Sequence, residues 1–533
     1  MGDQGDGPGD GPGRARWRGG ERRWVLIGGG TALAAALVAA TVLVIGGGPH
    51  RITATPHTCH TTTPSAPTDP TTSTTPTTPA GSAANTASAA PTADFDGDGH
   101  PDLAFGSLGS VPDGSGGGSI AVAYGSGDGT EPARCQYLTQ DDPGIPGKNR
   151  NEAYLGSDVV ARDLDEDGYT DLATLVFDWK PSVIVLWGSA DGLSRATRVP
   201  GTDGTHVPWQ FDPILDEQLA AGDFDGDRHT DLVFGLGSAK GLLKGPFQRD
   251  GTPADTAAVP APRNPGAATG SAGYGDLVTG DLNGDGTDDL VTLHSYEPGG
   301  DAGTRRPVGY LQGGPDGFTQ PKGVDLPEGA RATTGDVDGD GYDDLLLSPR
   351  EGDGDQLSVT VVYGSASGPG KRTTTVGPGT PGVPGAVSRD ADAVVTSLDT
   401  GDVNGDGYAD VVAGAPRDDP YVKPGPEQVL LLLGGPDGLT GEGARVYDGA
   451  GLRGGSGPPD GFGGEVCLTD LDGDRRADLV VAAYGDDKVE GSAWLLPATA
   501  AGPSVGGAVR LLGDSFDDTE DMDLYLGGGG IAG

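Results

Sequence analysis

The sequence predicts an all-β protein assembled from seven similar units, and three observations lead to this prediction. An aspartate-rich stretch recurs seven times, beginning at Asp94, Asp163, Asp223, Asp281, Asp336, Asp402 and Asp470. Successive copies start 55 to 69 residues apart, a period that marks an array of units, each too small to bury a core alone. Each copy leads into a short apolar run rather than an amphipathic helix, which indicates a loop between two short strands.

Each loop carries oxygen-bearing side chains at its positions 1, 3, 5 and 9. Alternating acidic residues on a tight turn bring several hard oxygens around one point, which suits Ca²⁺ with its roughly 6–8 oxygen ligands. Glycine at position 6 of five copies allows the backbone to turn back, so that the carbonyl of position 7 can supply a further oxygen. The sequence therefore predicts up to seven calcium sites. The predicted ligands are Asp94, Asp96, Asp98, His100, Asp102, Asp163, Asp165, Asp167, Tyr169, Asp171, Asp223, Asp225, Asp227, His229, Asp231, Asp281, Asn283, Asp285, Thr287, Asp289, Asp336, Asp338, Asp340, Tyr342, Asp344, Asp402, Asn404, Asp406, Tyr408, Asp410, Asp470, Asp472, Asp474, Arg476 and Asp478.

An EF-hand opens with the same spelling but needs a glutamate at position 12 and a flanking helix on each side. No copy has an acidic residue at position 12, so the EF-hand interpretation fails. Individual copies also differ from one another. Arg228 and Arg475 replace the glycine at position 6 of the third and seventh loops, where we expect weaker binding, and Glu166 replaces the glycine at position 4 of the second.

The loops and the phrases around them resemble the FG-GAP repeats of integrin α-chain propellers and of bacterial VCBS-type surface proteins. The phrases that give the repeat its name occur as Phe462-Gly463 before one loop and Gly414-Ala415-Pro416 after another. This resemblance covers residues 94–533 and implies a seven-bladed β-propeller with a Ca²⁺ loop in each blade. Short strands, frequent Gly and Pro, and radial repetition that protects sheet edges independently favour the same fold.

The N-terminal part differs in composition from the repeats. Residues 1–23 contain five arginines and are predicted to be a basic cytoplasmic tail, and the uncharged run 24–45 is long enough to be a transmembrane helix. An alternative is a cleaved export signal that releases the protein, because the run follows Arg22-Arg23. Residues 46–93 are rich in Thr, Pro and Ser and are predicted to be a disordered stalk.

The first loop lacks the short strand that precedes the other six. The phrase Tyr525–Gly533 at the C-terminus aligns without a gap with Tyr154–Arg162, which precedes the second loop. We therefore expect the C-terminal strand to pair with the blade that carries Asp94 and to close the ring, which removes two exposed sheet edges.

The three cysteines cannot form a disulfide framework. The sequence leaves two alternatives, a Cys135–Cys467 bridge and buried free thiols. The cluster His57, Cys59 and His60 lacks the fourth ligand of a zinc site.

The composition and the motifs bound the function. A net charge of −44 makes nucleic acid a poor partner. No nucleotide-binding or zinc-protease motif is present, so we expect no enzymatic activity. The expected function is a calcium-stabilised, monomeric recognition or adhesion module, anchored to the membrane by residues 24–45, with an extracellular protein or glycan as ligand. The alternative is the propeller part of a hydrolase or lyase that acts on polysaccharide or phospholipid.

Overall fold

The computed structural model describes most of the chain from residue 93 onward and short stretches before it. The described residues are 50–52, 54, 56–59, 61–62, 71–72, 93–107, 117–127, 129–150, 153–177, 181–202, 218–236, 239–260, 274–294, 308–349, 357–385, 387, 395–416, 427–453, 461–486, 490–516 and 530–533. They all belong to one compact unit, Gly46–Gly533.

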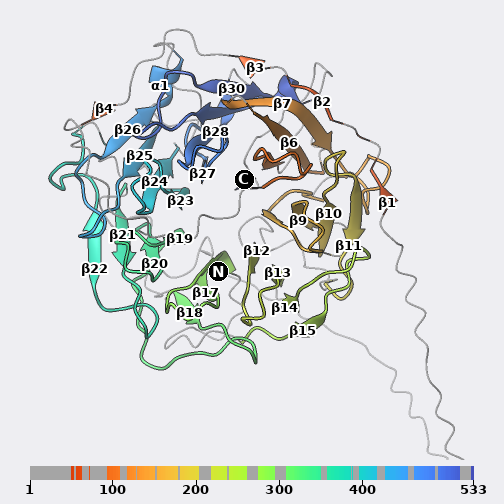
Figure 1. Cartoon of the computed structure of the whole chain (residues 1–533), viewed down its shortest axis with the longest axis horizontal. Helices are drawn as coiled ribbons and strands as arrows, with labels where there is room; N and C mark the ends of the chain where they lie inside the picture. The colour runs from red at the N-terminus through yellow and green to blue at the C-terminus, as the bar shows by residue number, and fades with distance from the viewer. Residues whose placement is uncertain are drawn as a thin grey trace, which may run out of the picture. The chain divides into compact units, whose positions relative to one another are not determined.

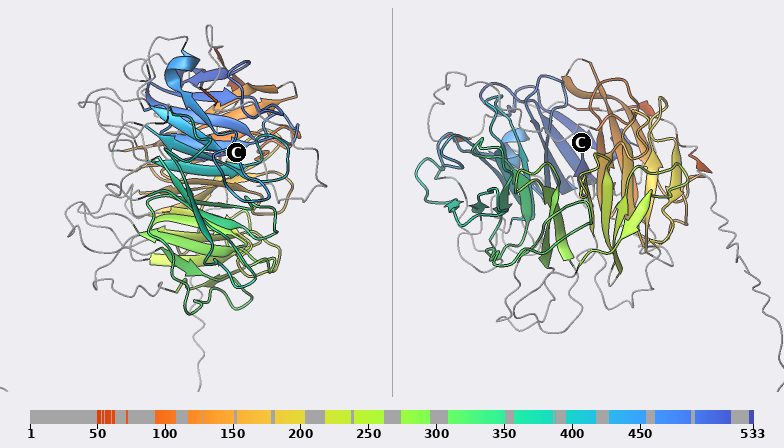
Figure 2. Two further views of the ribbon diagram at one scale, coloured as in Figure 1. Left: turned by 90° about the vertical axis from the view of Figure 1, so that its left-hand side faces the viewer. Right: turned by 60° about the horizontal axis from the view of Figure 1, so that its bottom comes forward.

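This unit is a seven-bladed β-propeller, as the sequence predicts. Seven antiparallel sheets of three to five strands follow one another around a central axis (Figure 1), and side views show them standing as twisted blades (Figure 2). Two short helical turns, α1 (Gly449–Leu452) and η1 (Gly513–Ser515), are the only helical elements among the described residues.

Each blade runs from an inner strand near the axis to an outer strand at the rim. The first blade consists of β31 (Ile531–Ala532), β5 (Leu103–Ser107), β6 (Ser119–Ser126), β7 (Gly129–Leu138) and β2 (His57–Thr58). The second consists of β8 (Val159–Arg162), β9 (Asp171–Val176), β10 (Ser182–Trp187), β11 (Arg195–Arg198) and β1 (His50–Arg51). The third consists of β12 (Gln218–Gly222), β13 (Asp231–Leu236), β14 (Ala239–Lys244) and β15 (Asp255–Ala257). The fourth blade consists of β16 (Tyr274–Gly280), β17 (Asp289–His294) and β18 (Gly309–Leu311), and the fifth of β19 (Ala332–Gly335), β20 (Asp344–Leu347), β21 (Val359–Val362) and β22 (Thr373–Val376). The sixth consists of β23 (Ser397–Gly401), β24 (Asp410–Ala415), β25 (Gln428–Leu432), β26 (Arg445–Asp448) and β4 (Thr71–Thr72). The seventh consists of β27 (Glu465–Thr469), β28 (Asp478–Asp486), β29 (Glu490–Leu496), β30 (Val509–Leu512) and β3 (Thr61–Thr62).

The core lies between the blades rather than within them. Seven hydrophobic clusters fill the seven junctions; one of them joins Leu172 and Ile184 of the second blade to Ile120 and Val122 of the first. A strand such as β9 or β24 is therefore buried along its whole length, because both of its faces meet a neighbouring blade. This explains why the predicted strands are continuous apolar runs and why one unit cannot fold alone.

The C-terminal strand completes the first blade, which is the partner that the sequence alignment predicts. Ile531 pairs with Phe105 and Ala532 with Ala104, on the inner edge of β5. The register differs from the gapless alignment by one residue, because Val159, not Val160, is the counterpart of Ile531. Ala93 occupies the last position of this inner strand, the one that Arg162 occupies in the second blade. The Ala93 carbonyl accepts a hydrogen bond from Asp102 N (2.6 Å), and Arg162 pairs with the equivalent residue, Asp171.

Part of the predicted disordered stalk instead forms edge strands. The strands β1, β2, β3 and β4 pair with the outer strands of the second, first, seventh and sixth blades, so this segment follows the rim against the chain direction (Figure 1). Outer strands offer unpaired N–H and C=O groups, and an extended backbone of almost any composition can pair with them. We call the described residues between 50 and 72 the rim segment.

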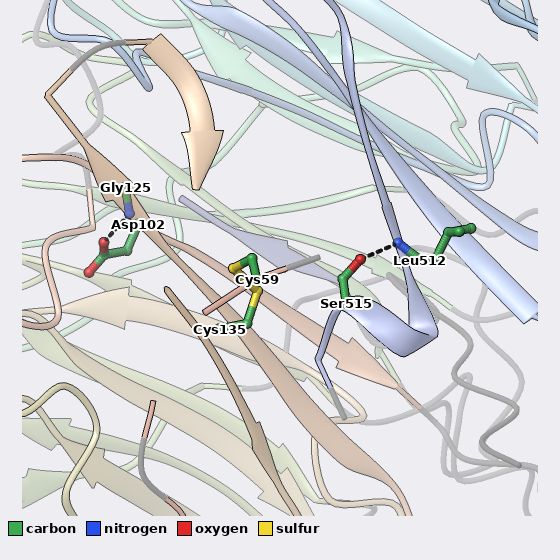
Figure 3. The surroundings of a disulfide bond; sticks show 6 residues. All are labelled: Cys59, Asp102, Gly125, Cys135, Leu512 and Ser515. Carbon is green, nitrogen blue, oxygen red and sulfur yellow. Dashed lines mark hydrogen bonds between the residues drawn. A yellow bond between two sulfur atoms is a disulfide. The ribbon is translucent and has the colours of Figure 1, made fainter. Parts of the chain in front are cut away.

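A disulfide fixes the rim segment to the first blade. Cys59 and Cys135 are bonded, with Cα atoms 5.0 Å apart, because β2 lies alongside β7 (Figure 3). The Cys135–Cys467 bridge considered from the sequence is therefore wrong, and Cys467 is a buried free thiol on β27. Since Cys59 is bonded to Cys135, it is also not a metal-ligating thiolate.

The predicted basic tail, residues 1–23, and the predicted transmembrane segment, 24–45, lie outside the described residues. Within the described part of the chain, no helix has the length and apolar character needed to cross a bilayer.

Candidate metal centres

In the second to seventh blades the aspartate-rich loop connects the inner strand to the second strand, and in the first blade it leads from Ala93 into β5. In the fifth loop, Asp336 Oδ1 accepts hydrogen bonds from Gly339 N (2.7 Å) and Asp340 N (3.1 Å), and Asp336 Oδ2 accepts from Gly341 N (2.9 Å). The first aspartate of the other loops is bonded in a closely similar way. Position 1 therefore shapes the loop and leaves its carboxylate facing the other oxygens.

Positive φ angles at positions 4 and 6 are part of this geometry. Gly339 and Gly341 have φ of 73° and 86°. Arg228 and Arg475, which replace glycine at position 6, have φ of 73° and 69°. The third and seventh loops thus keep the shared backbone at the cost of strain at a non-glycine residue, and weaker binding there stays a prediction.

The aspartate at position 9 anchors each loop to its own blade. Asp344 is fully buried; its Oδ2 accepts from Val337 N (3.1 Å) and its Oδ1 from Gly364 N (2.9 Å), beyond the third strand. Burial raises the pKa of Asp102, Asp171 and Asp344 to about 8, and that of Asp231, Asp289 and Asp478 to about 7; burial also raises the pKa of Asp410 well above its usual range. A nearby cation would favour the ionised form of these carboxyls.

The structure brings three carboxylates to within 4.8 Å of one another in five loops. These groups are Asp94, Asp96 and Asp102; Asp163, Asp165 and Asp167; Asp223, Asp225 and Asp231; Asp336, Asp338 and Asp344; and Asp470, Asp472 and Asp478. The fourth and sixth loops have an amide, Asn283 or Asn404, at position 3. Four of the five clusters consist of the aspartates at positions 1, 3 and 9, without the one at position 5. The cluster of the second loop consists of positions 1, 3 and 5, without position 9.

The residues at position 7 are the predicted backbone-carbonyl ligands. Three of them turn their side chains toward the preceding blade, where the rings of Tyr169, Tyr342 and Tyr408 lie against the position 4 glycines Gly97, Gly284 and Gly339. The prediction of these residues as carbonyl ligands is therefore compatible with the direction of their side chains.

The donor set fits a hard divalent cation. Asp165 Oδ1 and Asp338 Oδ1 are buried and have no hydrogen-bond partner among the described residues. A buried carboxylate oxygen without a donor is costly unless a cation or other donor satisfies it. Carboxylate, amide and carbonyl oxygens are the ligands that Ca²⁺ prefers, so the positions present are suited to hold it.

Hydrogen bonds also join each loop to the loop of the next blade. The position 8 N–H donates to the position 1 carbonyl of the preceding loop at five of the seven junctions, for example Asp343 N to Asp281 O (3.1 Å) and Ala409 N to Asp336 O (3.0 Å). At the junction between the second and third blades, His229 contacts Glu166 instead. The loops thus form a nearly continuous hydrogen-bonded ring on one face of the propeller.

Sequence reasoning missed the role of position 8 in these contacts. Asp288 and Asp343 each also accept a hydrogen bond from the position 1 N–H of the preceding loop, and Thr170 does so through its hydroxyl. The recurrence of Thr or Asp just before the position 9 aspartate was the available signal.

Comparisons with known proteins agree with this architecture. The fold and loops define a propeller with an aspartate-rich loop in each blade, and the FG-GAP repeat model matches residues 394–432 and 462–496, in the sixth and seventh blades. The chain is also 34% identical over 174 residues to integrin alpha-PS2 of Drosophila melanogaster; the match covers 30% of this chain and 12% of that protein. The chain therefore carries FG-GAP repeats and resembles the integrin α-chain propeller.

Solved structures with a similar fold are more distant. The BP39L lectin of Burkholderia pseudomallei is 15% identical with a TM-score of 0.44, covering 79% of this chain and 98% of its own. An Agrocybe aegerita lectin that recognises non-reducing terminal N-acetylglucosamine is 19% identical with a TM-score of 0.39, covering 67% and 78%. The exotype rhamnogalacturonan lyase YesX is 14% identical with a TM-score of 0.33, covering 74% and 65%. At these scores the similarities carry no argument about ligand or reaction.

Proposed function

We propose that this chain is a calcium-stabilised β-propeller that acts as a non-enzymatic recognition or adhesion module outside the cell. The observation that carries the proposal is the ring of loops, five of which cluster three carboxylates, together with the hydrogen bonds that join adjacent blades at five of the seven junctions. Bound Ca²⁺ would supply positive charge to these clusters. Side-chain oxygens of positions 1, 3, 5 and 9 and the carbonyl of position 7 would hold it.

The physical benefit of such sites is rigidity. Without a cation, carboxylates within 4.8 Å of one another repel, and the loops that join the blades are loosened. With the cation bound, each loop fixes the junction to its neighbour. A rigid ring presents a binding surface at little entropic cost on association.

The proposed location is the outer side of a membrane, with residues 24–45 as the anchor and the N-terminus inside. The Cys59–Cys135 disulfide supports an oxidising, extracellular environment, because disulfides are rare in the cytosol. The similarity to an integrin α chain supports the same location and an adhesion or recognition role. We propose an extracellular protein or glycan as the ligand and a monomeric state.

Calcium dependence can be tested by melting the full chain in millimolar Ca²⁺ and in EGTA. A ligand that binds only the folded state stabilises it by about 2.7 kcal/mol per site at 100 times its Kd. Several sites should therefore raise the melting temperature by many degrees. An identical melting temperature in both buffers would refute the calcium part of the proposal.

Ligand recognition can be tested on glycan arrays and cell-wall polysaccharides. We expect binding that requires Ca²⁺ and leaves the polymer intact. Shortening of a polysaccharide or release of a lipid headgroup would instead support the hydrolase or lyase alternative.

A further inference from the structure

Basic side chains contact the ligand carboxylates in five of the seven loops. The contacts are those of Arg134 with Asp96, Arg249 with Asp165 and Asp167, Lys244 with Asp225, Arg372 with Asp338, and Arg476 with Asp474. The distance from Lys244 Nζ to Asp225 Oδ2 is 2.7 Å, and that from Arg249 Nε to Asp165 Oδ2 is 2.5 Å. These five loops are the ones with aspartate, not asparagine, at position 3.

The two asparagine loops have neutral neighbours instead. In the fourth loop, Gln312 Nε2 donates to Asp285 Oδ2 (3.4 Å) and the Tyr310 hydroxyl donates to Asp289 Oδ2 (2.8 Å). In the sixth loop, the residue that corresponds to Lys244 is Leu433, since each precedes the glycine whose N–H reaches the position 9 aspartate. Among the described residues, no Lys, Arg or His forms an ion pair with a ligand carboxylate of these two loops.

The five basic residues come from four places in the blade, because Arg134 and Arg372 are equivalent. Each lies opposite the tyrosine that precedes the glycine bonded to the position 9 aspartate. Arg134 lies on the outer strand β7, whereas Lys244 ends the third strand β14. Arg249 reaches the second loop from the following blade, and Arg476 is position 7 of its own loop. A shared structural position explains only the contacts of Arg134 and Arg372, so the feature common to all five contacts is charge.

We propose that these bases are built-in counter-charges that equalise the seven loops, so that each presents about three net negative charges to a cation. An aspartate loop has four ligand carboxylates and one contacting base, and an asparagine loop has three ligand carboxylates and none. The number of charged ligands sets calcium affinity in oxygen-ligand loops. Equal charge therefore gives the junctions similar calcium affinities, and it limits repulsion in the metal-free loop. This inference rests on the proposed calcium sites.

The test compares two opposite changes of loop charge in the full chain. Lys244→Met removes the base of the third loop, and Asn404→Asp adds a carboxylate to the sixth. Lys371→Met is the matched control, because this exposed lysine has the same charge but no ion pair in the described structure. Asn404→Asp combined with Leu433→Lys rebuilds the arrangement of the third loop in the sixth; Leu433 is half-buried, so a lysine stem can replace its packing.

Two readouts are used, the melting temperature in EGTA and the calcium affinity from competition with a chelator. Lys244→Met and Asn404→Asp should each lower melting in EGTA by about 2 °C relative to Lys371→Met, and each should tighten one site about tenfold. The double variant should return both values to those of the unmodified chain. If Lys244→Met behaves like Lys371→Met while the unmodified chain still responds to Ca²⁺, the charge-balance inference is wrong. If neither the unmodified chain nor any variant responds to Ca²⁺, the proposed calcium function is refuted. The charge-balance inference then depends on melting in EGTA alone: it is refuted if Leu433→Lys does not restore the melting temperature that Asn404→Asp lowers.

Discussion

The junction between the fourth and fifth blades and the junction between the seventh and first are held by different means. At the first of these, Asp343 N donates to Asp281 O (3.1 Å), Asp281 N donates to Asp343 Oδ2 (2.9 Å), and the Tyr342 ring lies against Gly284. At the junction between the seventh and first blades, position 8 of the first loop is Pro101, which has no N–H to donate. A Cβ added at Gly473, position 4 of the seventh loop, would have no described atom within 4 Å. The repeat contacts that join internal blades are therefore missing at the seam, as we call the seventh–first junction.

The chain ends hold the seam instead. The C-terminal strand β31 completes the first blade, and a Cβ placed at Gly533 would lie 2.9 Å from Thr469 of the seventh blade. The rim segment pairs with both flanking blades through β2 and β3, and the Cys59–Cys135 disulfide fixes it. The comparison shows that repeated residues join the blades at five of the six internal junctions, whereas segments distant in sequence secure the closure.

Removing β31 should have the largest effect on the seam. Deletion of residues 530–533 removes the pairs of Ile531 and Ala532 with β5 and the hydrogen bond from Gly106 N to Gly530 O (3.0 Å). At about 1 kcal/mol for each lost hydrogen bond, we expect a loss of about 3 kcal/mol in the free energy of unfolding. Urea denaturation of the full and shortened chains measures it, and equal midpoints would show that β31 does not hold the ring closed.

Loss of the disulfide should have a similar or slightly smaller effect. The bridge closes a loop with a sequence separation of 76 residues, and removing such a link typically costs about 2–4 kcal/mol. Cys59→Ser should lower the melting temperature and abolish its response to reductant. Cys467→Ser is the control, because that thiol is free, and its melting should still respond to reductant. A reductant response that persists in Cys59→Ser would contradict this assignment.

The pH dependence should be shared by the seam and the internal junctions. Burial raises the pKa of Asp102 beside the seam and of Asp344 in the fifth blade to about 8, compared with about 4 in an unfolded chain. The folded metal-free protein then binds protons more tightly than the unfolded chain. Its stability should fall as the pH rises from about 5 to 8.

The calcium effect has the opposite sign, because cations bind the ionised carboxylates. The increase in melting temperature on adding Ca²⁺ should therefore grow over the same pH range. Melting in EGTA and in Ca²⁺ at several pH values measures both trends. A rise of the EGTA melting temperature with pH would contradict the assigned pKa values.

The smallest expected difference separates two matched glycine substitutions. Gly284 and Gly473 occupy position 4 of their loops with φ of 70° and 75°, so alanine is equally strained at both. A Cβ at Gly284 would lie 2.7 Å from Tyr342, whereas one at Gly473 meets no described atom within 4 Å. Gly284→Ala should be more destabilising by about 1 kcal/mol, the cost of modest overpacking. Equal losses would mean that the ring contact does not join the blades.

The sequence allowed the repeated part of the fold to be predicted, because loops and strands recur with one pattern. It also identified the partner of the C-terminal strand, but with the register shifted by one residue, since Ala93 fills a place that the alignment gave to the C-terminus. The rim segment was not predictable from composition. Its two-residue strands have no hydrophobic pattern and depend on free edges elsewhere in the chain.

The calcium positions were proposed from spacing alone, and the structure brings three carboxylates together in five of the loops. The contacting bases were not foreseen. Arg134 lies 38 residues from Asp96 and Arg249 lies 84 residues from Asp165, and no repeat of sequence connects these pairs. Such contacts follow from the packing of blades, which a single sequence does not reveal.

Hydrogen exchange of the full chain with and without Ca²⁺ tests most directly whether cations at the seven loops hold adjacent blades together. The amides at positions 4, 5 and 6, such as Gly339, Asp340 and Gly341, donate to the position 1 carboxylate in the loop itself. We expect Ca²⁺ to slow their exchange in all seven loops, together with the position 8 amides that join neighbouring blades, such as Asp343 and Ala409. Unchanged exchange at the loops in saturating Ca²⁺ would contradict the account.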